Sequence, residues 1–349
     1  MSRAAFGLTP DGRAVEAVTL RGPRLTARVL TLGATVQDLR LEGVAHPLVL
    51  GFPTADGYFG PGLYAGALVG RFANRLGGGR FVIDGRAYQA DRNERGRTLL
   101  HGGTEGIHHR IWTVADLSAD RVTLTLELPD GHMGFPGKLT IRAEISVAGD
   151  ALAFDLRATT DAPTLCNLAH HGYFALDGSG DARGHLLQVA ADHYLPVDAD
   201  LIPTGEVAPV TGTRFDFRQR RDLRGGEYDH NLCLGPSRTA LRPVATLTGR
   251  TGLRMEIETT EPGLQLYDGR HFDGVAGLVG LCYGPHAGVA LETQGWPDAP
   301  NHPGFPDAVL RPGQEYRAVT RYRFGRQAGP VRGRNHAASP ISGKNEHST

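Results

Sequence analysis

The feature that most constrains the fold is an alternation of apolar and polar residues that recurs along most of the chain. It is clearest in residues 122–128, 139–147 and 152–158, where apolar side chains occupy every second position. This period places apolar side chains on one face of a β-strand and polar ones on the other, so each segment is predicted to be a half-buried strand. Residues 81–88 predict a short hairpin around Asp84–Gly85.

Turn signals separate these segments. Asp-Gly or Gly-Asp pairs stand at residues 11–12, 84–85, 130–131 and 149–150, and such pairs favour tight turns because they tolerate positive φ. Helical periodicity is scarce, and only a short turn or two is expected near residues 54–58. Together with 48 glycines and 22 prolines in 349 residues, this pattern predicts an all-β protein, a large antiparallel β-sandwich rather than α/β units.

The domain organisation follows from composition. No break in composition divides residues 1–325, which predicts one domain of that extent. Residues 326–349 are polar and lack periodicity. They are therefore predicted to form a disordered C-terminal tail.

The charge balance and the cysteines narrow the choice of partner. Lys plus Arg and Asp plus Glu number 37 each, so no overall field points to nucleic acid or to an anionic membrane. The three cysteines are far apart, which predicts neither a disulfide framework nor a metal motif. No apolar signal core or stretch of transmembrane length is present. We expect a cytoplasmic protein that binds a small neutral ligand, as a monomer or a homodimer.

A carboxylate near the end of a predicted strand is the first candidate for chemistry. In residues 288–293, Val289, Leu291 and Thr293 share one face, whereas Ala290 and Glu292 share the other. The small alanine leaves room for a ligand over the glutamate, and a proline-rich loop follows. The alternative is an exposed glutamate at a strand end.

Two adjacent histidines form the second candidate. In the segment NLAHHGYFAL, residues 167–176, His170 and His171 face opposite sides if the segment is a strand. His171 shares its face with Tyr173 and two alanines, which suits a sugar better than the leucine and phenylalanine beside His170. A purely structural histidine is the alternative for either position.

Polar residues in glycine-rich segments complete the candidate set. His101 precedes Gly102-Gly103, and Asn74 and Arg75 precede a run of three glycines. Asn and Arg offer fixed hydrogen-bond donors that suit hydroxyl recognition, although surface solvation would also explain them. His101 with residues 108–109 matches no familiar zinc spacing, so no metal and no cofactor are expected. Asp229 and Gln265 are weak signals taken alone.

Several of these segments, in this order, resemble the aldose 1-epimerase (galactose mutarotase) family. The motifs are GRFANR, LHGG, the NLxxHxYFxL pattern, LPVDADLIPTGE, YDHN and LETQGWPDAPN, and the resemblance covers roughly residues 1–325. It implies an antiparallel β super-sandwich with a cleft for a monosaccharide. Two departures stand beside the proposed proton donor: His170 and Ala175 replace residues that are commonly asparagine in relatives.

The resemblance also implies roles for individual residues. Glu292 corresponds to the general base and His171 to the general acid. The residues that fall where the family contacts sugar are Asn74, Arg75, His101, Tyr173, Asp229 and Gln265. The expected reaction interconverts the α and β anomers of a free aldose such as galactose or glucose.

The expected mechanism is acid–base ring opening. An ionised Glu292 would take the anomeric hydroxyl proton and a protonated His171 would protonate the ring oxygen. Pairing of the two groups in a buried site is expected to raise the pKa of His171. Two alternatives remain: a hexose-6-phosphate epimerase of the same fold, for which no clear basic cluster is seen, and a non-catalytic sugar-binding module.

Overall fold

The computed structural model describes residues 2–326 of the chain. Of the predicted tail, residues 326–349, only Arg326 lies within the described part, where it ends the last strand. The rest of that prediction lies outside the described residues. Within them, the secondary structure consists of β-strands and short 3-10 helices, which confirms the predicted all-β class.

The largest sheet has nine strands and is antiparallel throughout. Its spatial order is β10 (Thr113–Leu117), β11 (Arg121–Leu128), β12 (Leu139–Ala148), β13 (Ala151–Thr160), β29 (Tyr316–Arg326), β23 (Leu253–Thr259), β22 (Arg242–Thr248), β17 (Leu186–Val189) and β20 (Arg221–Asp222). The three segments with the clearest alternation, residues 122–128, 139–147 and 152–158, lie in the neighbouring strands β11, β12 and β13. Those strand predictions are confirmed.

Two smaller antiparallel sheets accompany the nine-stranded one. The four-stranded sheet consists of β1 (Ser2–Leu8), β2 (Ala14–Arg21), β3 (Leu25–Leu30) and β4 (Val36–Leu41). The six-stranded sheet has the order β16 (Tyr173–Phe174), β27 (Val289–Gln294), β24 (Gly263–Tyr267), β21 (Asp229–Cys233), β18 (His193–Tyr194) and β19 (Ala208–Pro209).

Short two-stranded ribbons and 3-10 helices fill the connections. The ribbons pair β5 (Leu68–Val69) with β15 (Ala169–His170), β6 (Arg75–Leu76) with β9 (Leu99–Leu100), β7 (Arg80–Ile83) with β8 (Arg86–Gln89), β14 (Thr164–Leu165) with β28 (Val309–Leu310), and β25 (Val275–Ala276) with β26 (Cys282–Tyr283). The 3-10 helices are η1 (Ala55–Phe59), η2 (Gly77–Gly79), η3 (Ile107–His109), η4 (His132–Gly134), η5 (Ala182–Gly184), η6 (Leu278–Gly280) and η7 (Ala299–Asn301). The β7–β8 hairpin and the turn at η1 agree with the sequence predictions.

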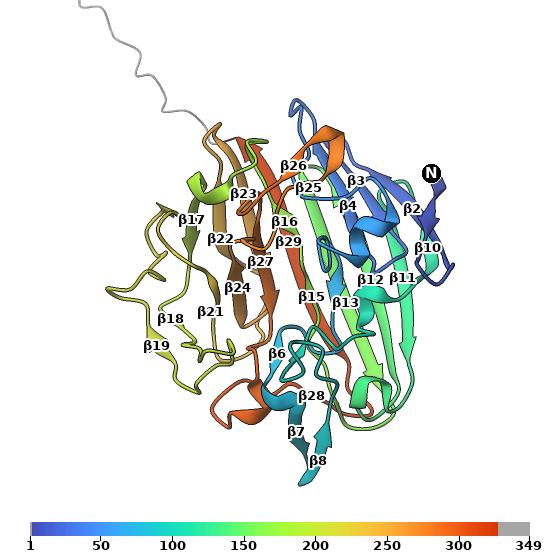
Figure 1. Ribbon diagram of the computed structural model, residues 1–349, viewed down its shortest axis with the longest axis vertical. Coiled ribbons are helices and arrows are strands. Elements are labelled where there is room, and N and C mark those ends of the chain that lie inside the picture. The colour runs from blue at the N-terminus through green and yellow to red at the C-terminus, as the bar shows by residue number, and fades with distance from the viewer. Residues whose placement is uncertain (1, 327–349) are drawn as a thin grey trace, which may run out of the picture.

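The three large sheets share one apolar core. Strand β29 runs through the middle of the molecule, between β13 and β23 (Figure 1). The four-stranded sheet packs near β11–β13, and its Val18 and Leu25 join the same buried cluster as Leu291 of the six-stranded sheet and Tyr322 of β29. Burial of these apolar side chains drives the assembly of the layers. The result is the predicted β super-sandwich.

No helix within residues 2–326 combines the length and apolar character that crossing a membrane would require.

Candidate active site

One face of the six-stranded sheet carries a grid of polar and aromatic side chains. Cross-strand pairing sets Glu292 opposite Gln265, and places Tyr173 and Tyr267 on either side of Ala290. Asp229 pairs with Tyr267 on the next strand. Paired residues share a face of a sheet, so these side chains all project to the same side. Four segments that are far apart in the sequence thus contribute side chains to one surface: those that contain Tyr173, Asp229, Gln265 and Glu292.

Glu292 is a buried residue of this face and does not lie at an exposed strand end. The predicted division of faces in β27 is confirmed, because Val289 and Leu291 enter the main core while Ala290 packs with Tyr173. Only 2% of Glu292 is exposed. The strand continues to Gln294, two residues beyond the glutamate. The predicted room over the Glu292 carboxylate is present, because Glu292 lines a cavity.

The two histidines do point to opposite environments, although the strand carrying them is interrupted. Strand β15 ends at His170 and β16 begins at Tyr173, so His171 and Gly172 lie between two short strands. His170 stacks on Phe154, with ring centroids 4.3 Å apart, and lies in the core. The ring of His171 instead lies 5.0 Å from that of Tyr173, on the polar face.

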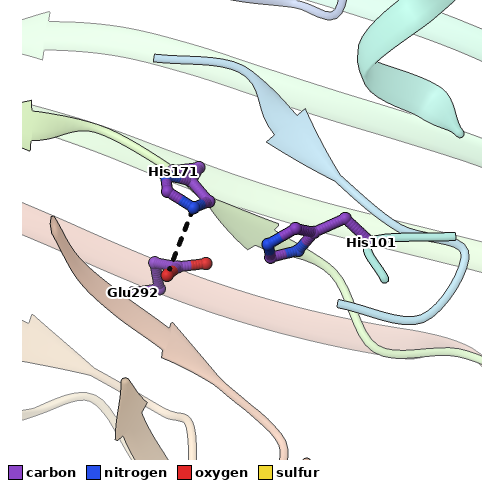
Figure 2. A group of neighbouring side chains, drawn as sticks. All are labelled: His101, His171 and Glu292. Carbon is purple, nitrogen blue, oxygen red and sulfur yellow. Dashed lines mark ion pairs between the residues drawn. The ribbon is translucent and has the colours of Figure 1, made fainter. Parts of the chain in front are cut away.

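His171, Glu292 and His101 converge from three segments far apart in the sequence (Figure 2). The Nε2 atom of His171 lies 3.5 Å from Oε1 of Glu292. One ligand-type atom from each of the three residues falls within 4.8 Å of the others, and all three side chains are buried. This spacing allows a proton to pass between the imidazole and the carboxylate, directly or through one bound hydroxyl group.

Burial shifts this pair toward its neutral forms. It lowers the pKa of His171 to about 3. Burial also raises the pKa of Glu292 well above the usual carboxyl range, and the negative charge of Asp229 adds to the rise. The expectation that pairing raises the pKa of His171 is therefore wrong, because burial disfavours the charged imidazolium and also favours the neutral form of Glu292. Both shifts favour the neutral form of the group concerned.

His101 is held as a neutral hydrogen-bond donor. The backbone N–H of Asn74 donates to Nδ1 of His101 over 3.1 Å, and the N–H of His101 returns a bond to the Asn74 carbonyl. Burial, with the nearby His171 and His108, keeps the pKa of His101 well below its usual value. A neutral imidazole whose Nδ1 accepts must carry its proton on Nε2.

This tautomer also bears on metal binding. His101, His171 and Glu292 are the group within residues 2–326 whose ligand atoms lie close enough together to hold a metal ion. A metal ion at Nε2 of His101 would need the lone pair of that nitrogen. Because Nδ1 accepts from Asn74, Nε2 carries the ring proton and has no free lone pair. The arrangement around His101 therefore favours donation to a ligand oxygen over metal coordination.

The tight turn after His101 depends on a glycine. Gly102 has φ of +87°, and a Cβ at this position would lie 1.8 Å from the Gly70 carbonyl oxygen. We expect Gly102→Ala to lower the free energy of unfolding by about 3 kcal/mol or more, because strain in the left-handed region adds to a backbone clash. Denaturant unfolding of both proteins measures this difference.

Gly96→Ala is the matched control. Gly96 also has a positive φ, +68°, but a Cβ there meets nothing within 4 Å. We expect it to cost only about 1 kcal/mol, from conformational strain alone. Equal costs at the two positions would show that the Gly70 approach does not constrain the turn.

A charged cluster lies beside the proton pair. Arg75 donates from Nε and Nη2 to the two carboxylate oxygens of Glu94, at 2.8 and 2.9 Å, and from Nη1 to Asp229 at 3.3 Å. Gln265 donates to the other oxygen of Asp229 over 2.6 Å. Arg75 is only 6% exposed, so the surface-solvation reading of this segment is wrong.

The charged side chains of this cluster and the His171–Glu292 pair line a cavity of about 560 Å³. Seven of the eight predicted site residues line it: Asn74, Arg75, His101, His171, Tyr173, Asp229 and Glu292. Gln265 does not; it lies behind Asp229, where it supports the carboxylate. Asn74 has φ of +66°, and its Oδ1 accepts from the N–H of Arg75, so its amide is partly committed to the loop.

Sequence reasoning missed part of the lining. Eleven further residues line the cavity: Gly60, Pro61, Leu63, Tyr64, Glu94, Arg95, Leu100, Leu201, Tyr267, Arg270 and His271. Tyr267 carried a usable signal, because it lies two residues after Gln265 and therefore on the same strand face. Tyr64 and Glu94 lie in irregular segments, where no periodicity marks a residue as facing a cavity.

The fold and the site together define the class of galactose mutarotase-like β super-sandwich proteins. The family profile described as aldose 1-epimerase matches residues 16–323. Galactose mutarotase of Rattus norvegicus is 40% identical over 340 residues, covering 93% of this chain and 98% of the relative. Aldose 1-epimerase of Escherichia coli K12 is 34% identical over 339 residues, covering 91% and 97%.

A solved structure gives the same result. An aldose epimerase homologue from C. elegans superposes with a TM-score of 0.84 at 30% sequence identity, covering 90% of this chain and 99% of that one. The chain belongs to the aldose 1-epimerase family. It is accordingly an isomerase that acts on carbohydrates.

Proposed function

We propose that this protein interconverts the α and β anomers of a free aldose, with Glu292 as general base and His171 as general acid. The observation that carries the proposal is the buried pair itself, with Nε2 of His171 3.5 Å from Oε1 of Glu292 at the wall of the cavity. A cyclic aldose is a hemiacetal whose opening moves two protons and transfers no electrons to a cofactor. A histidine and a carboxylate suffice for this chemistry.

Ring opening proceeds by two coupled proton transfers. Glu292 accepts the proton of the anomeric hydroxyl, and the O–H electron pair forms the C1=O double bond. The bond between C1 and the ring oxygen breaks, and the ring oxygen takes the proton of the His171 imidazolium. Rotation about the C1–C2 bond presents the other face of the aldehyde. Reversal of both transfers closes the ring as the opposite anomer and restores both side chains.

The reactive ionic form arises when sugar binds. In the protein alone, burial raises the pKa of Glu292 and lowers that of His171, which favours the neutral form of each group. Sugar hydroxyls that donate to the carboxylate stabilise its ionised form. The proton then moves to Nε2 of His171, 3.5 Å away. The two forms hold the same number of protons, so binding selects between them without exchange with solvent.

The remaining residues serve as hydroxyl contacts. His101 offers an Nε2–H donor and Arg75 has N–H groups beyond those bound to carboxylates, whereas Asp229 accepts. Tyr173 lines the cavity beside His171. Relatives named galactose mutarotase support galactose as a substrate, with glucose as the second candidate. Polarimetry on fresh α-galactose and α-glucose tests the activity, and no acceleration over the buffer rate with either sugar would refute it.

The two alternatives receive less support. Three arginines line the cavity. Arg75 is bound by Glu94 and Asp229, and Arg270 pairs with Asp268 and Glu227, so a phosphate would have to be bound by the exposed Arg95 alone. A binding module without catalysis has no use for a buried histidine and glutamate in contact. Assays with galactose 6-phosphate beside galactose separate the first alternative, because a phosphate-specific enzyme would prefer the phosphorylated sugar.

We further propose a cytoplasmic location and a monomeric or homodimeric state. Cys166, Cys233 and Cys282 are all unpaired thiols, and Cys282 is exposed, which is typical of a reducing compartment. Light scattering of the purified protein distinguishes the monomer from the homodimer.

The pH profile follows from the shifted pKa values. The pair is active with one proton: a second proton adds to His171 only toward its lowered pKa of about 3, and the last proton leaves at the raised pKa of Glu292. We therefore expect kcat/KM to be bell-shaped with a plateau through the neutral range, falling on the acid side as the second proton binds and on the alkaline side as the last one leaves. Initial rates from about pH 3, near the lowered pKa of His171, to about pH 10, corrected for buffer catalysis, measure both limbs. A flat profile over this range would contradict the assignment.

A further inference from the structure

Glu94 is a cavity residue to which neither the motifs nor the proposed proton transfers give a task. Its carboxylate binds Arg75 through two parallel bonds, 2.8 Å from Nε and 2.9 Å from Nη2. Such paired bonds fix the plane of a guanidinium group as well as its position. Both residues line the cavity, and the Glu94 side chain is 22% exposed.

The carboxylate is itself held in place. Thr98 donates from Oγ1 to Oε2 of Glu94 at 2.9 Å, and the backbone N–H of Glu94 bonds the Thr98 carbonyl at 3.1 Å. The chain then enters β9, which pairs with β6 so that Leu100 lies opposite Arg75. After the turn at residues 94–98, the chain therefore runs beside Arg75, the residue that Glu94 binds. His101 follows directly.

These hydrogen bonds leave two N–H donors of Arg75 unused. Three of its five N–H donors are used, two by Glu94 and one by Asp229 at 3.3 Å. Asp229 is in turn fixed by Gln265, the cross-strand partner of Glu292. A continuous row of hydrogen bonds therefore runs from Thr98 through Glu94, Arg75 and Asp229 to the strand next to the proton pair.

We propose that Glu94 is a positioning residue that orients Arg75, so that its two remaining N–H donors meet sugar hydroxyls. The inference rests on the proposed function, since it takes a sugar as the occupant of the cavity. Glu94 binds Nε and Nη2 of Arg75, whereas Asp229 binds Nη1. Within the described residues, no hydrogen bond or ion pair joins Glu94 to His171 or Glu292. It therefore governs affinity for the sugar and not the rate of proton transfer.

The test is the division of the effect between KM and kcat. For Glu94→Ala we expect KM for galactose to rise about 10- to 100-fold with kcat little changed. Without Glu94 to orient it, Arg75 loses its hydrogen bonds to the sugar, and these bonds contribute to binding and not to proton transfer. Glu105→Ala is the matched control, because it breaks a Glu–Arg pair of similar length, 2.9 Å to Arg110, outside the cavity lining. The control should leave both constants unchanged.

A double-mutant cycle with Arg75→Ala separates positioning from general damage. If Glu94 acts through Arg75, Glu94→Ala adds no further rise in KM once Arg75 is absent. An additive rise, an unchanged KM, or a fall in kcat alone would each overturn the proposal. Should Glu94→Ala fail to fold, Thr98→Val decides, because it removes only the hydroxyl bonded to Glu94 and should raise KM modestly in the same direction.

The outcome is distinguishable from failure of the proposed function. A wild-type protein that accelerates no mutarotation overturns that function by itself. If such a protein still binds galactose in calorimetry, the dissociation constants of the same variants replace KM, and the prediction for Glu94 is judged on them.

Discussion

Glu292→Gln is expected to lower kcat for mutarotation by about 10²–10⁴-fold while leaving the fold and galactose binding largely intact. Glutamine keeps the shape of the side chain and its hydrogen bonds but cannot accept the anomeric proton. The site makes the loss hard to compensate, because Glu292 is 2% exposed and no other carboxylate contacts His171 within the described residues. Polarimetry measures kcat, and calorimetry with galactose measures binding.

A second buried glutamate supplies the control. Glu261 is fully buried and bonds Arg238 at 2.7 Å, and it does not line the cavity. Glu261→Gln is expected to destabilise the protein by weakening that ion pair, with kcat preserved. Glu292→Gln is expected to show the reverse, with stability preserved and kcat reduced, because no arginine or lysine forms an ion pair with Glu292 within the described residues. A Glu292→Gln enzyme with wild-type kcat would remove Glu292 from the role of base.

His171→Asn is expected to reduce kcat by about 10²–10⁴-fold, whereas His170→Asn leaves kcat nearly unchanged and lowers stability. His171 lines the cavity and lies 3.5 Å from Glu292. His170 instead stacks on Phe154 and lies 3.4 Å from the hydroxyl of Tyr322, so its loss removes packing from the core. The adjacent pair thus provides a matched comparison of one substitution in two environments.

The pH profile sharpens this comparison. With His171 replaced, a single titrating group remains in the pair, and the alkaline fall of kcat/KM is expected to disappear because residual activity uses water as the acid. His170→Asn should keep both limbs. Equal losses of kcat in the two folded variants, or an alkaline limb that persists in His171→Asn, would contradict the proposed division of roles.

The strand pattern could be predicted locally because its cause is local. Alternation in residues 122–128, 139–147 and 152–158 needs only the pleat of a single strand, and those segments became β11, β12 and β13. The same reasoning assigned Glu292 and Ala290 to one face of β27. It was wrong about the continuity of the segment at residues 167–176, where a break at His171 and Gly172 depends on pairing with two different neighbours, β5 and β27.

The candidate site was reached from the sequence through motifs and not through geometry. Resemblance to the family pointed to His171, Glu292 and six further residues, and seven of the eight line one cavity. Local pattern alone left each of them open to a structural reading. Glu94 shows the limit, because its importance lies in two bonds to Arg75, nineteen positions earlier in the chain, made through an irregular turn.

By itself, the sequence determined the all-β class, the main strands, the family and the residues able to exchange protons. Only the tertiary structure decided their state. An isolated ion pair would raise the pKa of the histidine and lower that of the glutamate. Burial does the reverse, because it lowers the pKa of His171 and raises that of Glu292. Desolvation depends on every atom packed around a group, so no local stretch of sequence contains it. The order of strands sets that packing, and with it the direction in which the pKa of each group shifts.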